Sequence, residues 1–166
     1  KELGLRYSRS TNKFNDDPKR IFAVVDSNHA NGEIKMRSRG GFGIFLAGAL
    51  ISWQSKKHSM VTLSTSESEY IALSQCCKEL VSIKNQLLYV PGFIQDGKTK
   101  IFEDNQGCIK MCNQTNNWHR TKHIGIQYQF VRDLVEDEYI DLIYLPTEDQ
   151  VADIFTKPLG RLKFQK

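Results

Sequence analysis

The chain has 166 residues, 40% of them hydrophobic and 25% charged, with a formal net charge of +4 at pH 7. This composition is typical of one globular domain with its own core, and its four cysteines, two of them adjacent, argue against a disulfide framework and for a reducing compartment. The longest nearly apolar stretch, residues 41–53, is too short to span a bilayer, so we expect no membrane partner.

The first half of the chain predicts strands followed by a long helix. Residues 10–20 are polar and predict a linker. Apolar and β-branched runs predict strands at 21–26, 41–46 and 50–53, with a short β extension at 61–63. The clearest helix covers residues 64–88, and Ser64 and Glu67 have the spacing of a capping box at its start.

The second half alternates strands with helices. We expect a strand at 100–104, helices at 106–112 and 121–135, and a strand at 139–145. Pro146 ends this strand, and a last helix through residue 157 is expected to begin at a Thr147 cap, with Gln150 in its first turn. The predicted order is three strands, a helix, a strand, two helices, a strand and a last helix.

Four carboxylates stand near the ends of these predicted elements. They are Asp26, Glu69, Asp104 and Asp153. Hard divalent cations take oxygen ligands, and a pair of such ions drives phosphodiester hydrolysis, so the pattern indicates a metal site. Each acid alone has an ordinary alternative as a turn residue, a helix cap or a solvated helix position.

Basic residues gather in three short runs, at 35–39, 56–58 and 119–123, which favour a polyanionic partner such as a phosphate backbone. The last run overlaps a second pattern, in which Cys108, Cys112, His119 and His123 resemble zinc ligands. The six-residue gap between Cys112 and His119 is short beside the roughly twelve residues of a zinc finger, so zinc is the minor alternative.

Five separated segments carry a family resemblance. They are Leu50–Lys57, Leu63–Leu73, Glu103–Gln106, Arg120–Ile124 and Leu145–Leu159. In this order they resemble the ribonuclease H domain of copia-type long-terminal-repeat retrotransposon polyproteins, over most of the chain. The resemblance implies a ribonuclease H-like α/β fold, with a five-stranded mixed sheet flanked by helices. It implies a connection tail and linker at 1–19, the domain at 20–160 and a C-terminal tail at 161–166.

The implied activity is endonucleolytic hydrolysis of the RNA strand of an RNA–DNA hybrid during reverse transcription, with two Mg²⁺ ions that Mn²⁺ can replace. By motif, the catalytic and metal-binding residues would be Asp26, Glu69, Asp104 and Asp153. The candidate substrate contacts are Asn105, Gln106, Arg120, Lys122 and His123.

The expected partner besides the hybrid is the reverse transcriptase domain of the same polyprotein, in cytoplasmic virus-like particles or in the nucleus. One alternative is a non-catalytic nucleic-acid or protein binding module derived from such an element. Another is a related transposase or integrase, which Glu69 on the helix after the third strand disfavours.

Overall fold

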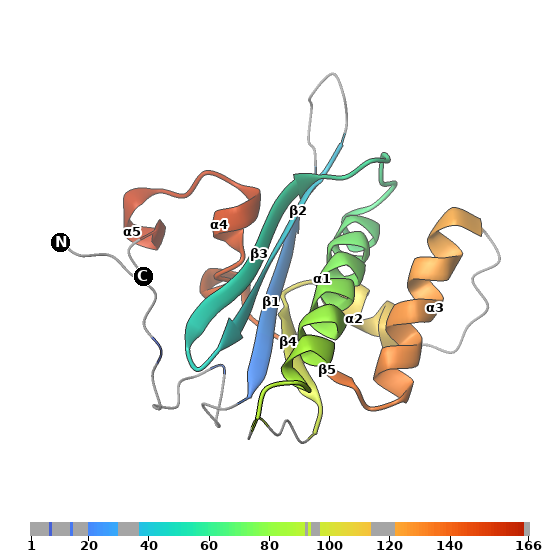
Figure 1. The fold of residues 1–166 in the computed structure, drawn as a ribbon. Coiled ribbons are helices and arrows are strands. Elements are labelled where there is room, and N and C mark those ends of the chain that lie inside the picture. The colour runs from blue at the N-terminus through green and yellow to red at the C-terminus, as the bar shows by residue number, and fades with distance from the viewer. Residues whose placement is uncertain are drawn as a thin grey trace.

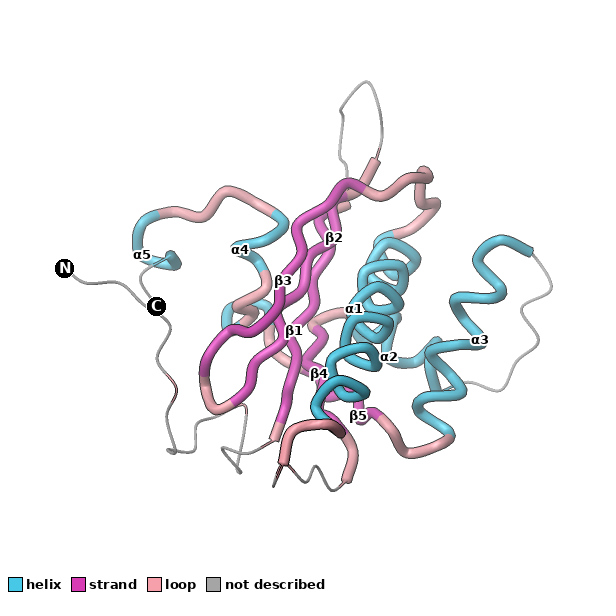
Figure 2. Tube along the Cα trace, in the orientation of Figure 1, coloured by secondary structure: helices cyan, strands magenta, loops and turns pink. Residues whose placement is uncertain are grey.

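The structure is a computed structural model that describes residues 7, 14, 20–29, 37–91, 93, 97–113 and 122–164, without the side chains of 122–124 and 162. One five-stranded sheet carries helices on both faces (Figure 1; Figure 2). The strands are β1 (Ile21–Asn28), β2 (Arg39–Leu46), β3 (Ala49–Lys57), β4 (Thr99–Glu103) and β5 (Ile140–Tyr144). The helices are α1 (Thr65–Leu87), α2 (Gln106–Asn113), α3 (Lys122–Glu136), the 3₁₀ turn η1 (Thr147–Asp149), α4 (Asp153–Thr156) and α5 (Arg161–Phe164).

The sheet is mixed, with strand order β3-β2-β1-β4-β5. β1 pairs antiparallel with β2 and parallel with β4, and β4 pairs parallel with β5. The carboxyl ends of β1 and β4 therefore meet at the same edge of the sheet. This confirms the predicted five-stranded mixed sheet, and it brings two of the predicted acids to neighbouring strand ends.

Alternate side chains of β1 face two separate cores. Ile21, Ala23 and Val25 belong to the larger core beneath α1, whereas Phe22 and Val24 belong to the smaller core on the α4 side. Helices α1, α2 and α3 lie over the first face and α4 over the other (Figure 1). Burial on both faces explains why β1 is a continuous apolar run rather than an alternating one.

The start of α1 follows the predicted cap. Ser64 Oγ accepts a hydrogen bond from the Glu67 backbone N–H at 3.1 Å. The Glu67 side chain accepts from the Leu63 backbone N–H at 2.6 Å, one residue before the position that a capping box uses. The predicted β extension at 61–63 is wrong, because these residues form no strand. The Leu63 N–H belongs to the cap instead, and the Thr62 hydroxyl bonds the Ser38 hydroxyl.

The predicted single helix at 148–157 is also wrong, because the segment divides into η1 and α4. Gln150 causes the break: its buried side chain donates to the Val25 carbonyl at 2.9 Å and accepts from the Ala152 backbone N–H at 3.1 Å. Thr147 is not the helix cap, since its hydroxyl donates to Asp104 Oδ2 at 2.8 Å. The described part of the expected C-terminal tail forms α5.

Gly41 lets α4 approach the sheet beside the site. It lies opposite Asp26 on β2, and a Cβ at this position would overlap the Cβ of Phe155 and crowd Thr156. Neither atom is the flexible end of a side chain, so relief requires movement of α4 or β2. The absence of a side chain at Gly41 is therefore a condition for the contact between α4 and Asp26.

We expect Gly41→Ala to lower the free energy of unfolding by about 1–3 kcal/mol, because it overpacks the contact with α4. Gly125→Ala is the matched control, since Gly125 lies in α3 and a Cβ there meets nothing within 4 Å. That change should leave stability unaltered or raise it by up to about 1 kcal/mol. Urea unfolding measures both; equal effects of the two substitutions would contradict the close approach.

Candidate metal centre

Asp26 lies near the end of the central strand, β1, where the sheet and α4 meet. Its side chain is buried. The Thr156 hydroxyl donates to Asp26 Oδ2, and Lys157 Nζ is 4.0 Å from the same oxygen. Two residues at the end of α4 therefore orient one oxygen of this carboxylate.

Glu69 enters the site from α1. It lies in the second turn on the same helix face as Ala72 and Cys76, and its side chain is 5% exposed. Glu69 Oε2 is buried and has no hydrogen-bond partner among the described residues. A buried carboxylate oxygen without a partner is costly, so this atom is chemically suited to bind a cation.

A hydroxyl pair links the elements that carry Asp26 and Glu69. Ser27, directly after Asp26, shares a hydrogen bond with Ser68, directly before Glu69. The imidazole of buried His58 reaches Ser27 Oγ with Nε2 at 3.4 Å. The neighbours of the two acids are thus tied across the boundary between β1 and α1, a link that sequence spacing did not reveal.

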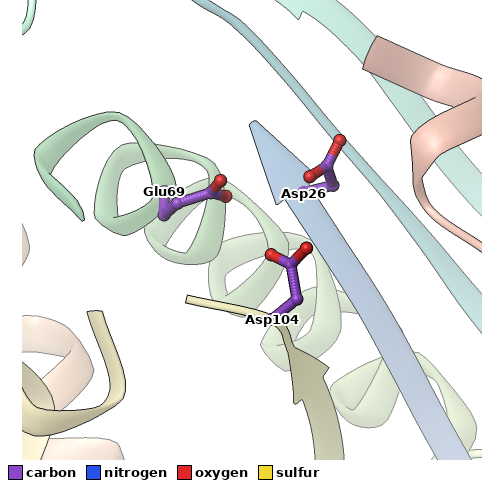
Figure 3. A group of neighbouring side chains, drawn as sticks. All are labelled: Asp26, Glu69 and Asp104. Carbon is purple, nitrogen blue, oxygen red and sulfur yellow. The ribbon is translucent and has the colours of Figure 1, made fainter. Parts of the chain in front are cut away.

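Asp104 follows the last residue of β4. Its side chain is partly exposed, and Oδ2 accepts from the Thr147 hydroxyl. One oxygen each from Asp26, Glu69 and Asp104 lie within 4.8 Å of one another, and Figure 3 shows the three carboxylates turned toward a common space. Three oxygen donors at this separation fit a hard divalent cation.

Burial and mutual repulsion disturb the titration of these acids. Burial raises the pKa of Asp26 to about 6, with smaller contributions from Asp153 and Asp104, although Thr156 and Lys157 act in the opposite direction. Burial and the nearby Glu103 raise the pKa of Glu69 well above its ordinary value. Both effects disfavour ionised side chains in the absence of a compensating cation.

Asp153, the fourth predicted acid, is fully buried at the first position of α4. It is not among the three acids of the 4.8 Å cluster. Lys157 Nζ lies 2.6 Å from Asp153 Oδ1, and Lys163 Nζ bonds Oδ2. Asp153 is therefore connected to the cluster through Lys157, which also faces Asp26.

Glu103 is a fifth acid at the site; it belongs to one of the five motif segments, but no role was predicted for it. It is fully buried at the end of β4; Oε1 accepts from the Asn105 backbone N–H at 2.9 Å, whereas Oε2 has no partner among the described residues. Burial raises its pKa well above the ordinary value, as do Asp104 and Asp26. Glu103 follows buried Ile101 by two residues in β4, so the two side chains point to the same face of the sheet. This spacing was the signal in the sequence for an inward-facing side chain.

The structure describes the side chains of only some of the predicted substrate contacts. Asn105 caps α2, because its Oδ1 accepts from the Cys108 backbone N–H at 3.0 Å and from the Ser66 hydroxyl at 3.1 Å. Gln106 is exposed at the start of α2. Lys122 and His123 begin α3, but their side chains, like the whole of Arg120, lie outside the described residues.

The structure describes only some of the candidate zinc ligands. Cys108 and Cys112 are buried free thiols on α2, and His119 lies outside the described residues. The hydrogen bond with Cys112 and burial raise the pKa of the Cys108 thiol well above its ordinary value. This disfavours the thiolate form that zinc binds.

No family model matches the chain. The retrovirus-related Pol polyprotein of transposon TNT 1-94 from Nicotiana tabacum is 31% identical over 165 residues, or 97% of this chain and 12% of that protein. The corresponding polyprotein of transposon RE2 from Arabidopsis thaliana is 33% identical over 145 residues, 87% of this chain and 10% of that protein. The Ty1-JR1 Gag-Pol polyprotein of Saccharomyces cerevisiae is 29% identical over 154 residues, 89% of this chain and 8% of that protein.

Solved structures resemble the fold. LC11-RNase H1, isolated from compost, superposes with a TM-score of 0.61 at 13% identity, covering 83% of this chain and 93% of that chain. RNase H1 from the archaeon Halobacterium salinarum NRC-1 has a TM-score of 0.58 at 15% identity, covering 82% and 94%. The chain spans only about a tenth of the curated polyproteins. It is therefore a homologue of one segment of the copia-type retrotransposon Pol polyproteins, and it has the ribonuclease H fold.

Proposed function

We propose that this domain hydrolyses the RNA strand of RNA–DNA hybrids, using divalent cations held by its acidic side chains. The observation that carries the proposal is the convergence of Asp26, Glu69 and Asp104, with oxygens within 4.8 Å. The polyprotein relatives and the ribonuclease H fold support the same activity. LC11-RNase H1 has also been solved in complex with an RNA/DNA hybrid, which supports the proposed substrate class.

The donors fit Mg²⁺, for which Mn²⁺ can substitute, because all are carboxylate oxygens and one, Glu69 Oε2, is buried without another described partner. When bound, a pair of such ions would activate the attacking water and neutralise charge on the leaving 3′ oxygen. Asp26, Glu69 and Asp104 would hold the ions, and Asp153 would join them from α4. Thr156 would orient Asp26 by the hydrogen bond that it donates to Oδ2.

Selection of a hybrid requires contact with the 2′-hydroxyl groups that only the RNA strand carries. Asn105 and Gln106 border Asp104 and are proposed to contact sugars or base edges, while Arg120, Lys122 and His123 are proposed to hold phosphates. We further propose the reverse transcriptase domain of the same polyprotein as a partner, in cytoplasmic particles. Among the residues that the structure describes, no helix is both long and apolar enough to cross a membrane.

We expect the domain to cut the RNA of a labelled RNA–DNA hybrid with Mg²⁺, and to leave double-stranded RNA and DNA intact. Glu69→Gln and Asp26→Asn should each lower the cleavage rate by about a hundredfold or more, because each removes a charged ligand. Gel analysis of the labelled strands measures the rate.

Glu67→Gln is the matched control for Glu69→Gln, since it makes the same change two residues earlier in α1. A glutamine still accepts the bond from the Leu63 N–H, so activity should stay within about threefold of the original. Cleavage that survives both site variants would overturn the assignment. Hybrid binding without cleavage would favour the non-catalytic binding module.

The raised pKa of Asp26 predicts how stability depends on pH without metal. A carboxyl whose pKa rises from 3.8 to about 6 on folding binds protons more tightly in the folded state, so its contribution to stability falls as pH rises through this interval. In EDTA, Asp26→Asn should therefore gain about 1–3 kcal/mol relative to the unmodified chain between about pH 4 and about pH 7.5. Urea unfolding at both pH values measures this difference; a constant difference would contradict the shifted pKa.

A further inference from the structure

Both oxygens of Asp153 are already paired with side-chain cations. Lys157 Nζ lies 2.6 Å from Oδ1, and Lys163 Nζ bonds Oδ2. The carboxylate is 0% exposed, whereas the side chains of Lys157 and Lys163 are 32% and 37% exposed. The acid is therefore fixed in the interior, while each cation has a route to solvent.

The two lysines also connect Asp153 with the three-acid cluster. Lys157 Nζ is 4.0 Å from Asp26 Oδ2, so one ammonium group lies near an oxygen of each acid. Lys163 donates to the Thr147 carbonyl at 3.3 Å, and the Thr147 hydroxyl donates to Asp104. A continuous series of polar contacts thus runs from Asp26 through α4 and α5 to Asp104.

A divalent cation and an ammonium group compete for the same carboxylate oxygens. A buried carboxylate that loses its partner is strongly destabilised, so Asp153 requires one cation or the other. Glu69 Oε2 and Asp153 Oδ1 are both buried without a hydrogen bond among the described residues, but only for Asp153 does an ammonium group, that of Lys157, lie 2.6 Å from this oxygen. The cluster can accept a cation directly, whereas Asp153 must first exchange a lysine.

We propose that Lys157 and Lys163 gate Asp153, so that divalent cations join the site in two steps of unequal affinity. The tighter step uses Asp26, Glu69 and Asp104. The weaker step brings in Asp153 and requires displacement of the lysines, with α5 released from Asp153. This inference rests on the metal site of the proposed function and adds a regulation of its occupancy by the chain's own cations.

The test has two parts. The full chain is titrated with Mn²⁺ alone and the heat of binding is measured by calorimetry; thermal unfolding is measured separately in EDTA. Lys163→Met and Lys157→Met should each tighten the weaker binding step by about threefold to fivefold, the range expected for a pair of partly exposed charges. The tighter step should change by less than about twofold in Lys163→Met. Lys157→Met also removes the ammonium group that lies 4.0 Å from Asp26 Oδ2, so it should tighten both steps. Both variants should melt at a lower temperature in EDTA, because buried Asp153 has lost a cation.

Lys78→Met is the matched control. Lys78 is exposed on α1, nine residues after Glu69 and so about 13 Å along the helix, and its loss should leave both binding steps unchanged. Lys163→Arg keeps the charge and should retain the weak second step. A lysine with a merely structural role would lower the melting temperature without tightening Mn²⁺ binding.

The gate is overturned if both methionine variants leave the weaker step unchanged or weaken it. If the unmodified chain binds Mn²⁺ in a single step, the appearance of a second step in either variant supports the gate, and its absence from both overturns it. Failure of the proposed function is separate. Tight binding that survives Asp26→Asn contradicts the three-acid site, whereas two-step binding without hybrid cleavage contradicts only the proposed activity.

Discussion

Negative charge held inside the protein is the constraint on which the arrangement depends. Asp26, Glu69, Glu103 and Asp153 are all buried, and Asp104 lies beside them at the surface of the same edge. Burial and repulsion both oppose ionisation of such a group. The structure relieves them in two ways: lysines neutralise Asp153, and Asp26, Glu69 and Asp104 turn oxygens toward a common space that suits a divalent cation.

The sheet supplies the rigid frame that holds these charges together. Parallel pairing of β1 with β4 places Asp26 and Asp104 at adjacent strand ends, where neither strand can shift without losing its ladder. Helix α1 packs on β1 through the larger core and carries Glu69 to the same edge. The hydroxyl pair of Ser27 and Ser68 strengthens this junction next to two of the acids.

The other face of the sheet contributes positive charge. Because Gly41 has no side chain, α4 approaches β2 opposite Asp26 and brings Thr156 and Lys157 into contact with that acid. Gln150 interrupts the helical segment between η1 and α4, because its side chain bonds the Val25 carbonyl of β1. This break sets the direction of α4 and, with it, the position of Asp153 beneath the two lysines.

Local pattern determined the position of nearly every strand and helix, because apolar periodicity and caps act over a few residues. The fold class and the set of four acids were predicted instead from the family resemblance of five separated segments. Local pattern failed at residues 61–63, where no strand forms and the Leu63 N–H bonds the Glu67 side chain. It failed also at 148–157, where the Gln150 side chain bonds the carbonyl of distant Val25. Only the tertiary structure decided that Glu103 joins the acids and that Asp153 is held by lysines rather than grouped with the other three. The physical reason is that burial and ion pairing depend on which elements meet in space, and no spacing along the chain specifies that meeting.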